Sequence, residues 1–341
     1  ITNNFYWKNE IKKDEIIKKI ISGLTDSLWD KFSEYMDVET TKQFNNVLSG
    51  DFEWIWAVIK KHELWVLVDS MIKWSPALKW GLLKWDIIIK ANSISLAWMD
   101  TTKAVELIKW PSGSKVNLEI LRVWETDILI KEITREKIKI PSVDTTDIKR
   151  DDIWYISLNM FWENTASEFL ELLNTFKNDE KIKWVIIDLR DNWWGYLQSA
   201  VEILSNFVEK WKVLVTTKFT NSLLNEVYTS NNTWNIFGKK IIILINWNSA
   251  SASEITAWAL KDYNKAILVW EKSYWKWSVQ QPFSLKDGSM IKLTIAKWYT
   301  PKDISIDHNG IEPDIEVKLK REDYTPVAWK ENEFQFYDRQ L

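Results

Sequence analysis

The chain has 341 residues, a formal net charge of −3 and no cysteine. This length allows two or three domains with their own cores, and the lack of cysteine excludes disulfides, a thiol nucleophile and thiolate metal ligands. The nearly balanced charge gives no reason to expect a nucleic-acid partner, and no apolar run approaches the roughly 18 residues that span a bilayer. The two histidines, His62 and His308, lie in polar stretches and are expected to be ordinary surface residues.

Tryptophan and glycine occur in unusual numbers, 25 and 8 respectively. Glycine normally makes up about 7% of a protein, and many turns depend on its freedom at positive φ. Tryptophans stand where turns are expected: Trp85 precedes a strand, Trp110 precedes Pro-Ser-Gly, and Trp275 and Trp277 flank Lys276. We therefore interpret most of them as glycine positions, as would result if UGA codons read as glycine were translated as tryptophan. The alternative, a tryptophan-rich carbohydrate-binding surface, would not place Trp at turn after turn.

Residues 1–50 are predicted to form a helical segment. Apolar side chains recur there at spacings that make one helix face, which we expect to pack against another surface. These residues are Ile16, Ile17, Ile20, Ile21, Leu24 and Leu28.

Residues 51–140 change to short β-rich runs separated by turn signals. The runs are LWVLVD (64–69), WDIIIKA (85–91) and KVNLEILRV (115–123), with one helical stretch, TTKAVELIK (101–109). With Trp read as Gly, WSPALKWGLLKWDIII (74–89) resembles the helix-turn-strand core of a PDZ domain. Such domains bind a peptide's C-terminal carboxylate through backbone N–H groups, which here would lie at Trp54, Ile55 and Trp56. A small β-rich domain without a ligand is the alternative.

Residues 141–341 alternate strands and helices, which predicts an α/β sheet. The expected strands are DIWYISL, WVIIDLR, KVLVTT and KKIIILIN, and the expected helices are TASEFLELLNTF, GYLQSAVEILSNFV and SASEITAWALKDY. Ser251 and Glu254 fit an S-x-x-E capping box, which alone could explain this serine. The functional interpretation places a serine hydroxyl at a helix N-terminus, where free N–H groups favour developing negative charge.

Lys276 lies between two tryptophans that we interpret as glycines. Close backbone packing around the lysine would desolvate its ammonium and lower its pKa, so that the neutral amine could take a proton from a serine. A serine–lysine pair is a known form of nucleophilic hydrolase chemistry, and it needs no histidine.

Together these strings resemble the carboxyl-terminal processing peptidases, also called tail-specific proteases, along nearly the whole chain. The matching motifs, read with Gly for most Trp and in the family's order, are NSASASEI (248–255), WALKD (258–262), WEKSYWKWSVQ (270–280), KWYTP (297–301) and GIEPDIEV (310–317). The resemblance implies a multidomain α/β protein. Its parts would be a helical N-terminal segment (1–50), a PDZ domain (51–140) and a crotonase-like α/β serine peptidase core (141–341).

By position, the resemblance makes Ser251 the nucleophile, Lys276 the general base and Gln280 the residue that orients the amine. It implies an oxyanion hole formed by the N–H of Ala252 and by the turn Asn192-Trp193-Trp194-Gly195. That turn should have no room for an indole, so Trp194 is expected to be glycine in a working enzyme.

The resemblance also gives supporting positions at Glu254, Asp262 and Ser273. Trp298 is the expected exception among the tryptophans, because the family tolerates an aromatic residue there.

The resulting hypothesis is a serine endopeptidase that recognises and cleaves protein substrates near their C-terminal tails, without a metal or cofactor. Its partners would be protein or peptide substrates bound through their C-termini, with no nucleic acid and a possible homo-oligomer. Family members are usually exported to the cell envelope, which is the location expected here. The alternatives are a non-catalytic scaffold that binds C-terminal tails on a peptidase-like fold, and another acyl hydrolase, which leaves the tail-binding domain unexplained.

Overall fold

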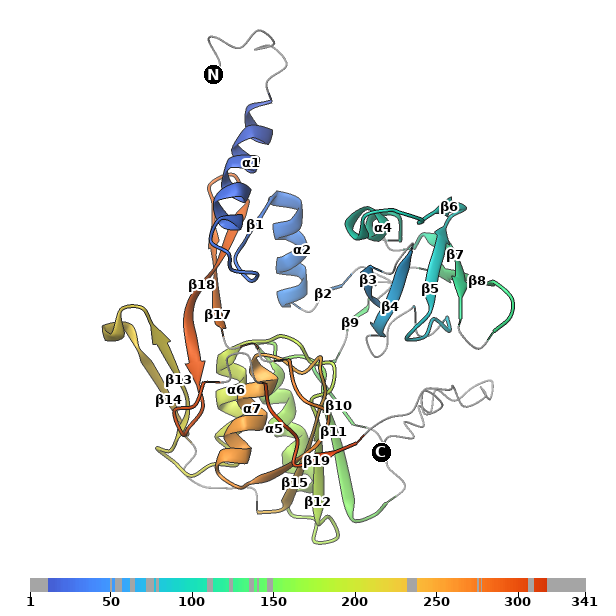
Figure 1. Ribbon diagram of the computed structural model, residues 1–341. Helices are drawn as coiled ribbons and strands as arrows, with labels where there is room; N and C mark the ends of the chain where they lie inside the picture. The colour runs from blue at the N-terminus through green and yellow to red at the C-terminus, as the bar shows by residue number, and fades with distance from the viewer. Residues whose placement is uncertain are drawn as a thin grey trace. The chain divides into compact units, whose positions relative to one another are not determined.

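The computed structural model divides the chain into two compact units (Figure 1). Unit 1 comprises residues 1–35, 142–285 and 290–341, and unit 2 comprises residues 36–141 and 286–289. The structure describes residues 12–49, 51–52, 57–61, 65–71, 77, 80–108, 113–122, 125–134, 138–139, 141–145, 150–231, 238–274, 276, 278–305 and 310–317. Residues 36–49 fall in unit 2, so the expected N-terminal segment of 1–50 is divided between the two units.

The larger sheet of unit 1 has six strands in the order β10-β11-β12-β15-β16-β19. The strands are β10 (Val143–Asp144), β11 (Ile153–Leu158), β12 (Trp184–Asp188), β15 (Lys240–Ile245), β16 (Ala266–Trp270) and β19 (Ile315–Glu316). All neighbouring pairs are parallel except β10 with β11. The helices α5 (Thr165–Phe176), α6 (Leu197–Leu204) and α7 (Ala252–Asp262) gather beside this sheet (Figure 1).

This sheet is apolar on both faces, as is typical of buried parallel strands. Along β12, Val185 and Ile187 join the large core shared with the helices, whereas Ile186 joins a smaller cluster with Tyr155 and Leu244. The strands β12 and β15 are parallel neighbours, so the segments that follow their carboxyl ends emerge at the same edge of the sheet. These two segments contain the Asn192 turn and Ser251.

A second sheet in unit 1 has the order β1-β18-β13-β14, with β17 also paired to β18. Its strands are β1 (Glu34–Met36), β13 (Val213–Phe219), β14 (Glu226–Thr229), β17 (Ser278–Ser284) and β18 (Met290–Tyr299), with a 3-10 turn η2 (Ser222–Leu224) between β13 and β14. β17 and β18 form a long antiparallel hairpin that begins two residues after Lys276. The short strand β1 therefore brings the N-terminal part of the chain to this hairpin.

Unit 2 has a six-stranded antiparallel sheet, ordered β3-β4-β5-β7-β8 with β6 paired to β5. The bounds are α2 (Val38–Ser49), β2 (Asp51–Phe52), β3 (Ala57–Lys61), β4 (Val66–Met71), β5 (Ile87–Ala91), β6 (Ile94–Ser95), α4 (Thr101–Ile108), β7 (Lys115–Leu121), β8 (Leu129–Thr134) and β9 (Ile138–Lys139). Alternate residues of β7, Val116, Leu118 and Ile120, are fully buried, which places one face of the sheet on the core. Arg122, just after β7, forms a 2.8 Å ion pair with the buried Asp86.

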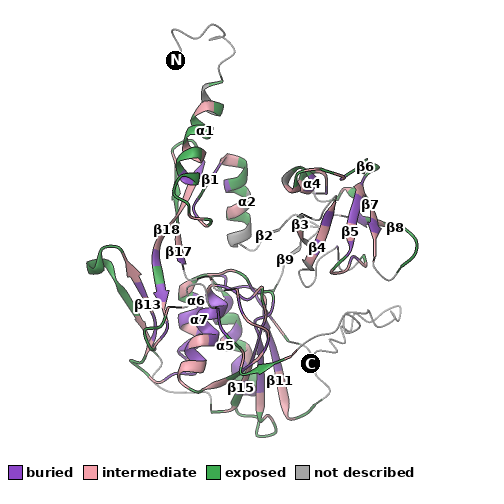
Figure 2. Ribbon diagram, viewed as in Figure 1, coloured by how far each residue is buried: buried purple, intermediate pink, exposed green. Residues whose placement is uncertain are grey.

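The strands and helices expected within residues 51–317 are found where the structure describes them, with ends shifted by a few residues, whereas the predicted helical segment 1–50 also contains the strand β1. The expected packing of the first helix, α1 (Lys13–Asp26), is not observed among the described residues. Ile17, Ile20 and Leu24 are 51%, 65% and 62% exposed, and Figure 2 shows much of this helix as exposed surface. The proposed carboxylate loop at residues 54–56 lies outside the described residues.

Tryptophans adopt backbone conformations that favour glycine. Among the described residues, five tryptophans have positive φ: Trp29 (55°), Trp85 (75°), Trp98 (61°), Trp211 (69°) and Trp270 (112°). A bulky L-residue is a genuine outlier there, because its Cβ crowds the neighbouring carbonyl. The remaining non-glycine residues with positive φ are Asn92, Ser93, Asp191, Ser251, Asn264 and Asp303, all small and polar. The tryptophans are thus the bulky group in a set of turns that glycine normally occupies.

Replacing Trp211 with glycine is expected to stabilise the protein. Trp211 is 73% exposed at φ 69°, so the substitution removes little packing and relieves the left-handed strain. The left-handed conformation destabilises a folded chain with tryptophan by about 1–2 kcal/mol. Glycine removes this strain, but its larger conformational entropy in the unfolded chain offsets about 0.5–1 kcal/mol of the gain. We expect a net gain of about 0.5–1 kcal/mol in the free energy of unfolding, measured by urea titration. Ile130, 72% exposed and without a positive φ, is the matched control: Ile130→Gly should destabilise, and equal effects at both positions would contradict the interpretation.

Candidate active site

Ser251 occupies a tight turn between β15 and α7. Its backbone has φ 59° and ψ −114°, a strained conformation of the kind that clusters at functional sites. The turn is anchored on both sides: the Ser249 hydroxyl donates to the Leu189 carbonyl (2.8 Å), and the Ala250 N–H donates to the Asn192 carbonyl (3.0 Å). Ser251 therefore stands at the N-terminus of α7, where the helix dipole favours negative charge.

Lys276 is held through its own backbone. Its N–H donates to Oε2 of Glu254 (2.8 Å), and its carbonyl accepts a hydrogen bond from the Trp298 indole (2.7 Å). Burial lowers the pKa of the Lys276 amine to about 8, and the charge of nearby Lys292 acts in the same direction, while Glu254 opposes both. The direction is the one that the sequence predicts. A large fraction of this amine is neutral near pH 8, which an ordinary lysine is not.

The carboxylate of Glu254 joins the two segments. It is fully buried and accepts three hydrogen bonds, from the Ser251 N–H (3.0 Å), the Lys276 N–H (2.8 Å) and the Ser273 hydroxyl (2.6 Å). The first two donors bind the same oxygen, so the backbone nitrogens of Ser251 and Lys276 are at most about 6 Å apart. Two residues separated by 25 positions in the sequence are thus brought side by side.

Ser273 completes this arrangement. Its hydroxyl donates to Glu254 and accepts a hydrogen bond from the Ile311 N–H (2.9 Å). A Cβ on the adjacent Gly310 would lie 2.7 Å from the Ser273 carbonyl oxygen, so that approach requires glycine. The GIEPDIEV segment thereby holds the Ser273 hydroxyl that donates to the Glu254 carboxylate.

The Asn192 turn packs directly against the serine turn. The Asn192 carbonyl accepts hydrogen bonds from the Ala250 N–H and from the Ser253 hydroxyl (2.8 Å), while its side-chain amide donates to the Leu158 carbonyl (2.7 Å). Gly195 lies so close to Phe161 that a Cβ would come within 2.2 Å of the Phe161 Cβ. The structure thus brings together the two segments that the sequence assigns to an oxyanion hole.

Trp194 is half-buried, and its ring lies edge-on to that of Tyr196, with centroids 5.7 Å apart. The expectation that this residue is glycine in a working enzyme stays a prediction.

Two expected site residues have other partners. The Gln280 amide donates to the hydroxyls of Ser278 (2.6 Å) and Thr294 (3.3 Å) rather than toward Lys276. Asp262 is the last residue of α7, so the length of that helix, about 16 Å at 1.5 Å per residue, separates it from Ser251. The interpretation of Asp262 as a residue of this site is therefore wrong in its placement.

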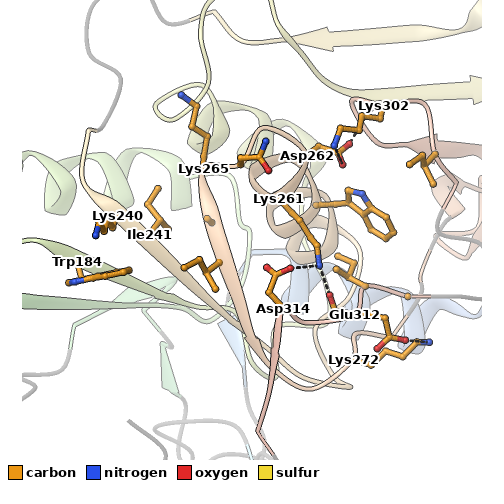
Figure 3. A pocket seen from close by; sticks show the side chains of 17 residues that line it. Trp184, Lys240, Ile241, Lys261, Asp262, Lys265, Lys272, Lys302, Glu312 and Asp314 are labelled. Atoms are coloured by element: carbon orange, nitrogen blue, oxygen red, sulfur yellow. Dashed lines mark hydrogen bonds and ion pairs between the residues drawn. The ribbon is translucent and has the colours of Figure 1, made fainter.

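Asp262 lines a separate cavity of about 1030 Å³ at the far end of α7 (Figure 3). Its carboxylate accepts a hydrogen bond from the Lys302 N–H (3.1 Å). Other lysines around the cavity are also paired: Lys261 with Asp314 (2.9 Å) and Lys272 with Glu312 (2.6 Å). The position of Asp262 is thus explained by a local network of charges.

Sequence reasoning missed a buried ion pair just before the Asn192 turn. Asp188 and Arg190 are 2.6 Å apart, and Asp188 also accepts a hydrogen bond from the Tyr155 hydroxyl (2.6 Å). The Arg190 guanidinium lies over the Trp270 ring at 4.6 Å. The available signal was a D-x-R sequence at the end of an apolar strand, where charged residues need partners to be buried.

Metal and membrane features are absent from the part of the chain that the structure describes. Within it, no three His, Cys, Asp or Glu side chains are grouped to hold a metal ion. Nor does any described helix combine the length and apolar character needed to cross a membrane.

Comparisons with known proteins agree with this architecture. A model of peptidase family S41 matches residues 152–317. A "Probable CtpA-like serine protease" of Staphylococcus aureus (strain N315) is 36% identical over 320 residues, covering 93% of this chain and 63% of the relative. Its counterpart in Staphylococcus haemolyticus (strain JCSC1435) is 34% identical over 317 residues, 92% of this chain and 62% of that one. The chain thus spans a little under two thirds of these relatives.

A solved structure shares the fold. The photosystem II D1 C-terminal processing protease superposes with a TM-score of 0.69 at 20% identity, covering 93% of this chain and 88% of that one. The similarity extends over both units and supports a mixed α/β fold.

The buried amine of Lys276 should make stability depend on pH. The pKa falls from 10.5 to about 8 on folding, so the unfolded chain binds more protons between these values, and the free energy of unfolding should rise with pH across that window. Below pH 8 the buried ammonium lowers the free energy of unfolding by up to about 3 kcal/mol, because a change of one unit in pKa corresponds to about 1.4 kcal/mol. Lys276→Met should recover much of this cost at pH 7 and flatten the pH dependence.

Urea unfolding at pH 7 and pH 10 measures both effects. The control is Lys297→Met, which removes an exposed lysine from β18. If the two variants have the same stability at pH 7, the amine of Lys276 is not desolvated.

Proposed function

We propose that this protein is a serine endopeptidase in which Ser251 is the nucleophile and Lys276 the general base, and that it cleaves protein substrates near their C-terminal tails. The observation that carries the proposal is the shared oxygen of Glu254, which accepts from the N–H groups of both residues. The match to peptidase family S41 and the lowered pKa of Lys276 support it.

The geometry supports a two-step acyl transfer. The neutral Lys276 amine takes the proton of the Ser251 hydroxyl as Oγ attacks the scissile carbonyl, and the resulting ammonium then protonates the departing amine. The tetrahedral oxyanion would be stabilised by the N–H of Ala252, in the first turn of α7, and by a backbone N–H of the Asn192 turn. Water, deprotonated by the same amine, then hydrolyses the acyl-enzyme. Gln280 would orient the Lys276 amine only after its own amide turns away from Ser278 and toward the lysine.

Substrate selection is proposed to lie in unit 2. An antiparallel sheet covered by α4 offers a strand edge to an extended peptide, and the loop with Trp54, Ile55 and Trp56 would receive its terminal carboxylate. The partners are then protein tails, and the cell envelope is the proposed location, as the family resemblance implies.

Ser251→Ala should abolish peptide cleavage while leaving the fold intact. A fluorophosphonate probe should label the wild-type enzyme at Ser251 and leave the variant unlabelled, as read by peptide mass spectrometry. Because only the neutral amine is a base, kcat/KM should rise with pH with an inflection near 8, the pKa of Lys276. Ser253→Ala is the matched control, since Ser253 is two residues away and donates to the Asn192 carbonyl; it should keep its probe labelling. Tail-peptide binding without labelling of Ser251 would instead favour a non-catalytic scaffold.

The identity of the turn residues is part of the proposal. We assign glycine to most tryptophan positions, including Trp194 and Trp211, and tryptophan to Trp298, whose indole donates to the Lys276 carbonyl. The messenger RNA should carry UGA at the positions assigned to glycine and UGG at position 298.

Protein isolated from its own organism tests this assignment by mass spectrometry. The tryptic peptide spanning residues 191–210 should have glycine at 193 and 194, and the peptide spanning 298–302 should retain tryptophan. Tryptophan at both places would refute the assignment.

A further inference from the structure

A short stretch near the N-terminus lies against the candidate active site. We call residues 30–35 the N-terminal arm; it runs from the end of the α1 segment into β1, which pairs with β18 (Figure 1). The arm is fixed by specific contacts. The Ser33 hydroxyl donates to Asp30 (2.6 Å) and accepts a hydrogen bond from the Thr294 N–H (3.0 Å), while Glu34 forms an ion pair with Lys292. It is therefore an ordered part of unit 1.

Phe32 is the arm's contact with the lysine. The Lys276 Nζ lies 5.8 Å from the centroid of the Phe32 ring, which is half-buried. A cation is attracted to an aromatic face within about 6 Å, so at this distance the attraction is weak. The ring is thus an apolar group beside the amine, and apolar surroundings disfavour the charged form of a lysine.

The charged groups around the amine come from three elements. Lys292 on β18 disfavours the ammonium, Glu254 on α7 favours it, and Glu34 of the arm partly offsets the charge of Lys292. Lys31 is a further cation beside the same ring: its Nζ lies 4.8 Å from the centroid of Phe32 and 5.3 Å from that of Tyr274. These charges act in opposite directions on the pKa of the Lys276 amine. The remaining influence is the apolar surface beside the amine, which is the Phe32 ring.

We propose that the N-terminal arm is part of the active site and that Phe32 is a positioning residue, which keeps water away from the Lys276 amine so that it can act as a base. This inference rests on the proposed role of Lys276. It means that a residue 244 positions away in the sequence sets the pH range in which the peptidase works.

Phe32→Ala tests this role. Water reaching the amine should raise the midpoint of its titration from about 8 by about one pH unit or more, and kcat/KM at pH 7 should fall about tenfold with little change in KM. The titration is read directly from the pH dependence of acetic-anhydride labelling at Lys276, quantified by peptide mass spectrometry in the full chain. Phe32→Leu, which keeps the apolar cover without an aromatic face, should leave the midpoint within about 0.3 units.

Two further variants complete the experiment. Leu28→Ala removes an apolar side chain that is 52% exposed just before the arm, and it should leave the titration unchanged. Phe32→Gln keeps a side chain of intermediate size but makes it polar and admits water, so it should shift the midpoint upward even if Phe32→Ala does not fold. The proposal is overturned if Phe32→Ala or Phe32→Gln leaves the midpoint at about 8, or if Phe32→Leu shifts it as far as they do. Because labelling of Lys276 does not require hydrolysis, this result is independent of whether Ser251→Ala loses activity.

Discussion

The arrangement of the candidate active site depends on one buried carboxylate. Glu254 has no exposed surface, and a buried carboxylate is tolerated only when its oxygens are fully hydrogen-bonded. Its three donors come from three segments: the serine turn, the lysine segment and Ser273. Losing any one segment would leave an unsatisfied charge in the core, so the fold cannot relax one segment without disturbing the others. The same constraint that satisfies the carboxylate therefore keeps Ser251 beside Lys276.

This constraint also explains how the chain can bury an amine. A desolvated lysine is unfavourable by itself, and its side chain would tend to turn toward water. Here the backbone on both sides of the side chain is fixed, by Glu254 at the N–H and by Trp298 at the carbonyl. The unfavourable desolvation of the Lys276 amine is thus offset by the hydrogen bonds that its own backbone makes with Glu254 and Trp298. Functional sites commonly combine local strain with support from well-packed surroundings, and the positive φ of Ser251 fits the same pattern.

The part of this structure that sequence could predict is the part set by short-range periodicity. The apolar run Val185-Ile186-Ile187 predicted a strand, and the structure buries it on both faces. The S-x-x-E spacing predicted the contact between Ser251 and Glu254, because residues i and i+3 meet at a helix start. Contacts between distant segments left no local signal. Asp262 was assigned to the wrong end of its helix, since a motif match carries no distance, and nothing near Phe32 indicates that β1 carries it to Lys276.

The tryptophans can be compared in two ways, by composition and by backbone conformation. Composition alone suggests that glycine has been replaced, but it cannot say at which positions. The backbone separates two groups: Trp211 and Trp85 have left-handed φ in turns, whereas Trp298 is fully buried in a strand and uses its indole N–H. Trp298 therefore makes a side-chain hydrogen bond that glycine could not make. The glycine that is present in the Asn192 turn, Gly195, approaches Phe161 more closely than any side chain would allow. Turns of this shape favour a residue without a side chain, so the backbone of Trp85 and Trp211 supports the glycine assignment proposed above.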